Sequence, residues 1–197
     1  MKKIKNVSKI ILEGGVIVAL LFATVSCNNS QKQEDPQEVA EEHNDAKMNN
    51  NADEMDAQFL VDASEINMKE IQLGQLAQQK AMMSDVKDLG KMMESEHTKA
   101  MNELKDLAEK KIISIPTSLT DEYQKEYNNF ADKKAMDFDK DYCDAMVAGH
   151  KDAVNKFEKA STDATDPDIK AWAAATLPAL RNHLDHAMTC QEKCKKM

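Results

Sequence analysis

Four segments of this chain carry apolar residues at the spacing of an amphipathic helix, and one titratable residue interrupts each stripe. The interrupting residues are Glu70, His97, His150 and His183. In the second segment, the stripe around the histidine consists of Leu89, Met93, Ala100, Leu104 and Leu107. A titratable side chain on the buried face of a helix is uncommon, because burying a charge without a partner is costly. The four stripes therefore predict a helical bundle with one glutamate and three histidines facing inward.

The same spacing gives the fold class. The chain has only five glycines and four prolines, and no segment alternates apolar and polar residues with the period of a strand. We therefore expect an all-α fold, with helices over about 53–80, 84–111, 134–159 and 167–194. Four amphipathic helices of this length predict an antiparallel four-helix bundle.

Local signals refine these boundaries. Asp166, followed by a proline, is a strong N-cap for the last helix, which we expect to be kinked near Pro178. Between the second and third helices, Pro116 follows a β-branched run that disfavours helix. Ser118 or Thr120 can then cap further helical turns, which either continue into the third helix or form a short extra helix before it.

The N-terminal residues have the pattern of a bacterial signal peptide. Four lysines precede an apolar run that is too short for a comfortable transmembrane helix. The run Leu20–Cys27 resembles a lipobox, in which Cys27 becomes lipid-modified and forms the new N-terminus. We therefore expect a lipoprotein signal peptide over 1–27, a disordered polar tether over 28–52 and the bundle domain over 53–195. A simply secreted protein or an uncleaved anchor is the alternative.

The expected anchor and the charge of the chain limit its partners. Asn28 after the cysteine implies, by resemblance to other lipoproteins, an outer-membrane location facing the periplasm or the cell surface. Without residues 1–27 the chain has 22 basic and 34 acidic residues, a net charge near −12. An acidic surface repels nucleic acid and anionic lipid. We therefore expect membrane contact through the lipid anchor, no nucleic acid, and an envelope protein as a candidate partner.

Recognisable motif segments are spread along all four expected helices. They are Glu70–Ala77, Met92–His97, Phe138–Tyr142, Met146–His150 and Leu177–Leu184. Together they cover about residues 55–188 and resemble a family of bacterial exported proteins of unknown function. That family is often labelled putative outer-membrane protein and is placed among ferritin-like folds. The resemblance implies a ferritin-like bundle in the cell envelope but no particular chemistry, because the family has no assigned activity.

Ferritin-like di-iron centres take a Glu from each of two helices and a Glu-x-x-His from each of two others. This chain offers Glu70 and the pair Glu94 and His97, but it has a leucine at position 180 and His150 where glutamates are needed. An ordinary di-iron carboxylate centre is therefore not expected. A mononuclear transition-metal site remains chemically sensible, with Zn, Fe, Mn or Cu bound by Glu70, His97, His150 and His183.

The position of each of these four residues along the bundle axis tests whether they can bind one metal ion together. Counted from the turn near residue 82, Glu70 and His97 differ by about three residues, roughly 4.5 Å, so they can meet. Counted from the ends of the last turn, His150 and His183 differ by about six residues, roughly 9 Å, and meet only with a kink or an offset packing. The alternative is that the three histidines are neutral core residues bonded to carboxylates or to Tyr142.

A second, weaker candidate lies at the end of the last helix, where His186, Cys190 and Cys194 are spaced four apart on one face. Soft ligands at this spacing suit Cu(I) or Zn, and the chain has 13 methionines. Alternatively, the methionines are core residues and the cysteines oxidise after export. With Cys27 lipidated, Cys143, Cys190 and Cys194 remain, so at least one lacks an intramolecular disulfide partner.

The sequence contains no nucleophile elbow, phosphate loop or cysteine–histidine catalytic motif. The leading hypothesis is therefore a non-enzymatic, membrane-tethered bundle that acts in binding or stress resistance in the cell envelope. The first alternative is a metal-binding or metal-dependent redox protein, with a transition-metal ion as its cofactor. The second is a protein-interaction module with an exposed apolar helical face. Convergence of Glu70 with the three histidines would favour the first alternative.

Overall fold

The computed structural model describes residues 34–48 and 50–196, without the side chains at positions 52 and 136. These residues form six α-helices and no strand, which confirms the all-α prediction. The helices are α1 (Pro36–Asp45), α2 (Asn51–Lys80), α3 (Ser84–Lys111), α4 (Asp121–Ala131), α5 (Ala135–Asp163) and α6 (Pro167–Cys194). No described helix is long and apolar enough to cross a membrane. The expected signal peptide over 1–27, with lipidation at Cys27, lies outside the described residues.

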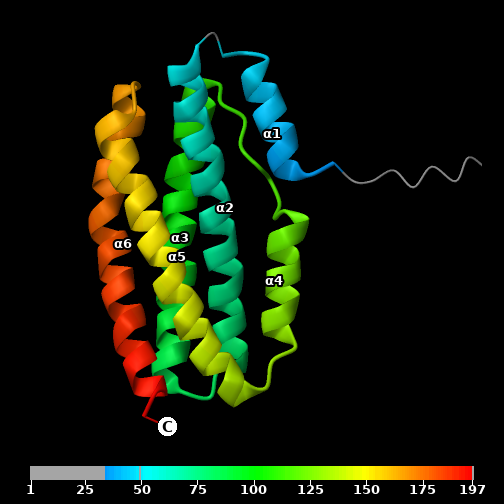
Figure 1. Cartoon of the computed structure of the whole chain (residues 1–197), viewed down its shortest axis with the longest axis vertical. Helices are drawn as coiled ribbons and strands as arrows, with labels where there is room; N and C mark the ends of the chain where they lie inside the picture. Colours follow the sequence, from blue (N-terminus) through cyan, green and yellow to red (C-terminus); the bar gives the residue numbers. More distant parts are fainter. Residues whose placement is uncertain (1–33, 49, 197) are drawn as a thin grey trace, which may run out of the picture. The chain divides into compact units, whose positions relative to one another are not determined.

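Helices α2, α3, α5 and α6 form the bundle (Figure 1). α2 packs along α3, α5 packs along α6, and the two hairpins meet through α2 against α5 and α3 against α6. Each helix runs antiparallel to the neighbours it contacts (Figure 1). One long connection, which contains α4, returns the chain to the other end of the bundle before α5 begins. The predicted antiparallel bundle is therefore confirmed, and the extra short helix is separate from α5.

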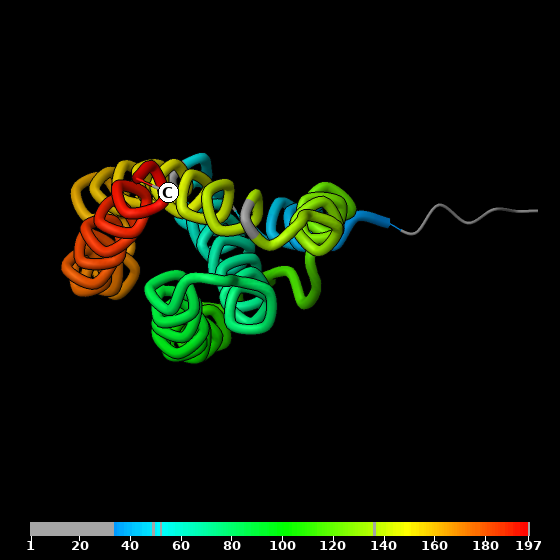
Figure 2. Tube along the Cα trace, turned by 90° about the horizontal axis from the view of Figure 1, so that it is seen from below, coloured from blue at the N-terminus to red at the C-terminus, as the bar shows by residue number. Residues whose placement is uncertain are grey.

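Part of the segment 28–52, expected to be a disordered tether, is helical. Both α1 and α4 contact α2 and lie outside the four bundle helices (Figure 2). The Asp35 side chain caps α1 by accepting a backbone N–H of its first turn. Buried Asn44 donates to the Ser114 carbonyl and accepts from the Ser114 N–H, at 2.9 and 2.7 Å. The expectation is corrected for residues 36–45, because a cap and these hydrogen bonds replace the apolar stripe that the segment lacks.

A polar layer divides the core of the bundle into two apolar clusters. One cluster surrounds Phe138 and the α2–α3 turn, and the other surrounds Phe157 and the α5–α6 turn. Along every bundle helix, the residues of one cluster end before those of the other begin. The gaps between them hold the four buried residues Glu70 on α2, His97 on α3, His150 on α5 and His183 on α6. The residues that interrupt the sequence stripes therefore lie in one layer.

Each of the two hairpin turns is held by a buried aspartate that belongs to the other hairpin. Asp139 of α5 accepts the backbone N–H groups of Met82 and Met83 in the α2–α3 turn, at 3.1 and 2.8 Å. Asp56 of α2 accepts two successive N–H groups of the α5–α6 turn, at 3.0 and 2.7 Å. Each turn therefore depends on a carboxylate supplied by the other hairpin.

α2 and α3 approach each other closely at two glycines. A Cβ atom on Gly74 would lie 2.6 Å from the Gly90 carbonyl oxygen, and a Cβ atom on Gly90 would lie 2.7 Å from the Gly74 carbonyl oxygen. Both contacts are to backbone atoms, so neither helix can relieve them by rotating a side chain. The absence of a side chain at both positions sets the spacing of this hairpin.

We expect Gly74→Ala to lower the free energy of unfolding by about 1–3 kcal/mol, because the added methyl group forces two helix backbones apart. Gly149→Ala is the matched control, since its Cβ would meet only the Glu70 Oε1 at 3.4 Å. Removing a helical glycine there should add up to about 1 kcal/mol of stability. Urea unfolding measures both variants, and equal stability of the two would contradict the close packing.

A buried carboxyl group on α2 makes the stability depend on pH. Glu65 is 4% exposed, and its Oε1 has no hydrogen-bond partner among the described residues. Burial, and then the negative charges of Asp35 and Asp62, raise the pKa of Glu65 from 4.5 to about 7. Between these pH values the folded protein keeps a proton that the unfolded chain releases.

We therefore expect the free energy of unfolding to fall as pH rises from about 4.5 to about 7 and then to level off. Glu65→Gln should remove this part of the pH dependence and add up to about 3 kcal/mol above pH 7. Urea unfolding between pH 4 and pH 8 measures the effect, with exposed Glu103→Gln as the matched control. A Glu65→Gln variant that keeps the wild-type pH profile would contradict it.

Candidate metal centre

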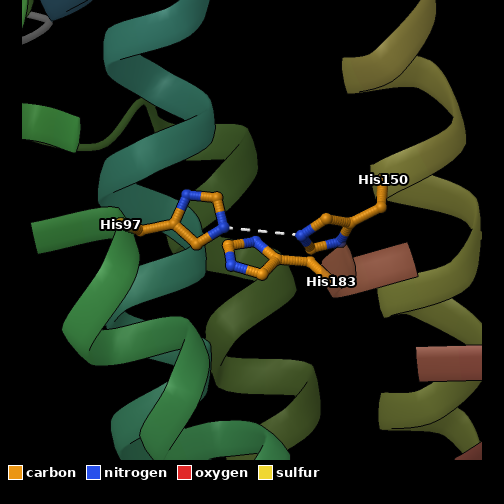
Figure 3. Close-up of side chains that lie close together, drawn as sticks. All are labelled: His97, His150 and His183. Carbon is orange, nitrogen blue, oxygen red and sulfur yellow. Dashed lines mark hydrogen bonds between the residues drawn. The ribbon is translucent and has the colours of Figure 1, made fainter. Parts of the chain in front are cut away.

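The polar layer brings three histidines together (Figure 3). His97 from α3, His150 from α5 and His183 from α6 are only 1–2% exposed. One ligand nitrogen from each ring lies within 4.8 Å of those from the other two. The ring centroids are 5.1–5.5 Å apart. Three of the four ligands predicted from the sequence therefore converge.

The convergence of His150 with His183 follows from the length of α5. The sequence predicts an end near Lys159, whereas α5 continues to Asp163. His150 then lies thirteen residues before the end of α5, and His183 lies sixteen residues after the start of α6 at Pro167. A difference of three residues corresponds to about 4.5 Å along a helix. The expected offset of roughly 9 Å is therefore corrected, and α6 is one continuous helix through its internal proline.

Each histidine has one ring nitrogen held by a hydrogen-bond acceptor. The pairs are His97 Nδ1 with Asn67 Oδ1 at 2.9 Å, His150 Nδ1 with the Met146 carbonyl at 2.9 Å, and His183 Nε2 with Glu96 Oε2 at 3.1 Å. The amide nitrogen of Asn67 donates to the Ala63 carbonyl, which turns its oxygen toward His97. An acceptor requires a donor, so we assign the single proton of each neutral ring to this outer nitrogen.

The inner nitrogens are then left with bare lone pairs. His97 Nε2 and His150 Nε2 face each other at 3.4 Å. His183 Nδ1 is buried and has no hydrogen-bond partner among the described residues. Burial, followed by the two neighbouring histidines, holds the pKa of His97 well below its usual range, so a second proton on this ring is disfavoured. Burial also lowers the pKa of His183, against the opposing effect of Glu96.

The spacing of these nitrogens suits a metal ion. A metal–nitrogen bond of about 2.1 Å places two ligands of a tetrahedral site about 3.4 Å apart. The facing nitrogens of His97 and His150 have this separation. The ligand nitrogen of His183 lies within 4.8 Å of both, so the three histidines form one candidate ligand group. An outer N–H bonded to a carboxylate, a carbonyl or an amide oxygen is the usual environment of a metal-binding histidine.

Glu70, the fourth predicted ligand, is buried beside the histidines but is not part of the group within 4.8 Å. Its Oε2 has no hydrogen-bond partner among the described residues. Burial raises the pKa of Glu70, and the neighbouring His150 lowers it. The Tyr142 hydroxyl also has no such partner, so the alternative of a histidine bonded to Tyr142 is not realised. A bond to a carboxylate is formed by His183 alone of the three.

The structure does not bring together the three residues of the weaker candidate site at the end of α6. Exposed His186 and buried Cys190 line a pocket of about 310 Å³ together with Asp85 and Asp88. Cys194 instead faces Cys143 and Met83, at sulfur–sulfur distances of 3.8 and 3.5 Å.

Sequence reasoning missed Cys143 and Met83 as neighbours of Cys194, because the register between α6 and the other helices has no sequence signal. It also missed Asn67, although its position three residues before Glu70 places both side chains on one face of α2.

Residues 38–190 match the model of a family that is described as a domain of unknown function (DUF4142). No curated protein and no solved structure matches the sequence.

Proposed function

We propose that this chain, which belongs to the DUF4142 family of unknown function, binds a transition-metal ion through His97, His150 and His183. The observation that carries the proposal is the 3.4 Å separation of His97 Nε2 and His150 Nε2 in the buried core, with the single proton of each ring assigned to its outer nitrogen. Two facing lone pairs repel each other, and a cation between them turns this repulsion into coordination.

The competing interpretation, in which the histidines are ordinary core residues, leaves buried polar atoms without partners. His183 Nδ1 and Glu70 Oε2 would both remain unpaired, at a cost of about 1–3 kcal/mol each. A bound cation gives the nitrogen a ligand bond and gives the carboxylate a compensating positive charge. The first alternative from the sequence is therefore preferred to a bundle without a metal.

The kinds of ligand atom in the site limit which metal ions it can bind. Three neutral imidazoles suit Zn, Cu and Fe, and the buried carboxylate of Glu70 adds a hard donor nearby that also suits Mn. Three protein ligands leave a fourth coordination position, as in many catalytic zinc sites. We propose metal binding as the function of this centre, and we propose no reaction for it.

We further propose that the protein works in the cell envelope as a lipoprotein with a ferritin-like bundle. The basic N-terminal segment, the apolar run and the lipobox-like sequence ending at Cys27 support this location. The long connection between the second and third bundle helices supports the ferritin-like comparison, because that fold has one such crossover. An interaction module has less support, since the exposed large apolar residues Met55, Met82, Ile112 and Met188 lie on different segments.

We expect the full-length protein, stripped of metal, to take up about one equivalent of a transition-metal ion when dialysed against Zn(II), Cu(II), Fe(II) or Mn(II) in turn. His150→Ala should abolish this uptake, because it removes one of the two facing nitrogens. Mass spectrometry of the metal content measures the uptake. An ion at 100 times its Kd should also raise the free energy of unfolding of the wild type by about 2.7 kcal/mol.

His43→Ala is the matched control, because His43 is exposed on α1, and it should bind metal as the wild type does. His150→Leu, which fills the vacated volume with an apolar side chain, provides the test if His150→Ala does not fold. Metal uptake by a folded His150 variant equal to that of the wild type, or failure of the wild type to take up any of the four ions, would overturn the proposal.

Substitutions of Asn67 test whether this residue positions the His97 ring. Asn67→Ala removes the acceptor that holds the outer N–H of His97, so the affinity for the ion should fall by about 10–100-fold. Asn67→Asp keeps an acceptor oxygen at the same place and should bind more tightly than Asn67→Ala. Competition with a chromophoric chelator measures both affinities. Equal affinities of Asn67→Ala and the wild type would exclude this role.

A further inference from the structure

Four sulfur-bearing side chains gather near the end of the bundle where α2 turns into α3. We call Met83, Cys143, Cys190 and Cys194 the sulfur cluster. Cys194 Sγ lies 3.8 Å from Cys143 Sγ and 3.5 Å from Met83 Sδ. All three cysteines are free and buried. Cys190 also neighbours Cys143, since its thiol, and then burial, raise the pKa of Cys143.

The geometry points to a second metal site: we propose that Cys143, Cys194 and Met83 bind one Cu(I) ion. A metal–sulfur bond of about 2.3 Å places two thiolates of a tetrahedral site about 3.8 Å apart, which is the separation of the two cysteine sulfurs. Thiolate and thioether sulfur together select Cu(I) over harder ions. The site therefore differs in chemistry from the imidazole nitrogens of the polar layer.

The Met83 thioether in contact with the Cys194 thiol favours a metal over a disulfide. A disulfide between Cys143 and Cys194 would use both thiol sulfurs and would leave Met83 as an apolar packing residue. In a Cu(I) site, the thioether of Met83 completes a third coordination position without adding charge. Each thiol that binds the ion releases its proton to solvent, and no electron is transferred.

The surroundings favour a cation in two ways. Buried Asp139 lies beside the cluster, because its carboxylate accepts the backbone N–H of Met83, and a carboxylate at this place attracts a cation. Cys190 also lines the pocket of about 310 Å³ that holds Asp85 and His186. Carboxylate and imidazole groups at a pocket that reaches the cluster provide an entry path for a metal cation.

Titration of the reduced full-length protein with Cu(I), without oxygen and in competition with bicinchoninate, tests the proposal. The wild type should withhold about one equivalent of Cu(I) from the chelator. Cys143→Ser and Cys194→Ser should each weaken binding by more than about 100-fold, and Met83→Leu by about tenfold, because each removes a ligand. X-ray absorption of bound copper should show sulfur neighbours at about 2.3 Å.

Two variants provide controls for these substitutions. Met188→Leu makes the same chemical change as Met83→Leu at an exposed residue outside the sulfur cluster and should bind Cu(I) as the wild type does. His97→Ala should also keep its Cu(I), which separates this site from the histidine centre. If Cys143→Ser does not fold, Cys194→Ser in the last turn of α6 gives the same test. Unchanged affinity in the folded cysteine variants, or nitrogen neighbours around copper, would overturn the proposal.

Discussion

Three hydrogen bonds to the outer ring nitrogens of the histidines determine how the side chains lie in the middle of this bundle. An amide oxygen, a backbone carbonyl and a carboxylate each hold one outer N–H, and these bonds orient the inner nitrogens of His97, His150 and His183 toward one another. With the protons assigned to the outer nitrogens, the inner nitrogens keep the lone pairs that the proposed metal ion would use. The four bundle helices must therefore stay in one register, because a shift of one helical turn would separate the ring nitrogens by about 5.4 Å.

The two apolar clusters on either side of the polar layer offset the free-energy cost of burying it. A buried polar group without a partner costs about 1–3 kcal/mol, and the layer contains two such atoms, Glu70 Oε2 and His183 Nδ1. The aromatic and aliphatic side chains above and below offset that cost through the burial of apolar surface. The contact between Gly74 and Gly90 lies next to the layer and fixes α2 against α3. A rigid support of this kind holds metal ligands in place before the ion arrives.

Sequence patterns predicted the parts of the structure that depend on one helix at a time. The period of each stripe placed the three histidines inside, and capping signals located Asp166 at a helix start and gave Thr120 as one of two candidate caps. Features that depend on two helices were not predicted. The neighbours of Cys194 come from the α2–α3 turn and from α5, and the height of His150 along the bundle depended on where α5 ends. α1 was missed because polar contacts with the loop after α3 stabilise it in place of an apolar stripe.

The two aspartates that cross between the hairpins have a consequence for how the chain assembles. If the hairpins separated, Asp139 and Asp56 would each lose their donors, and both turns would be left with unpaired N–H groups. Neither half is therefore a self-sufficient folding unit, and the bundle should form in one cooperative transition. The histidine centre draws one ligand from the first hairpin and two from the second. An ion bound there would join both halves, so the proposed centre would load only after the halves have docked.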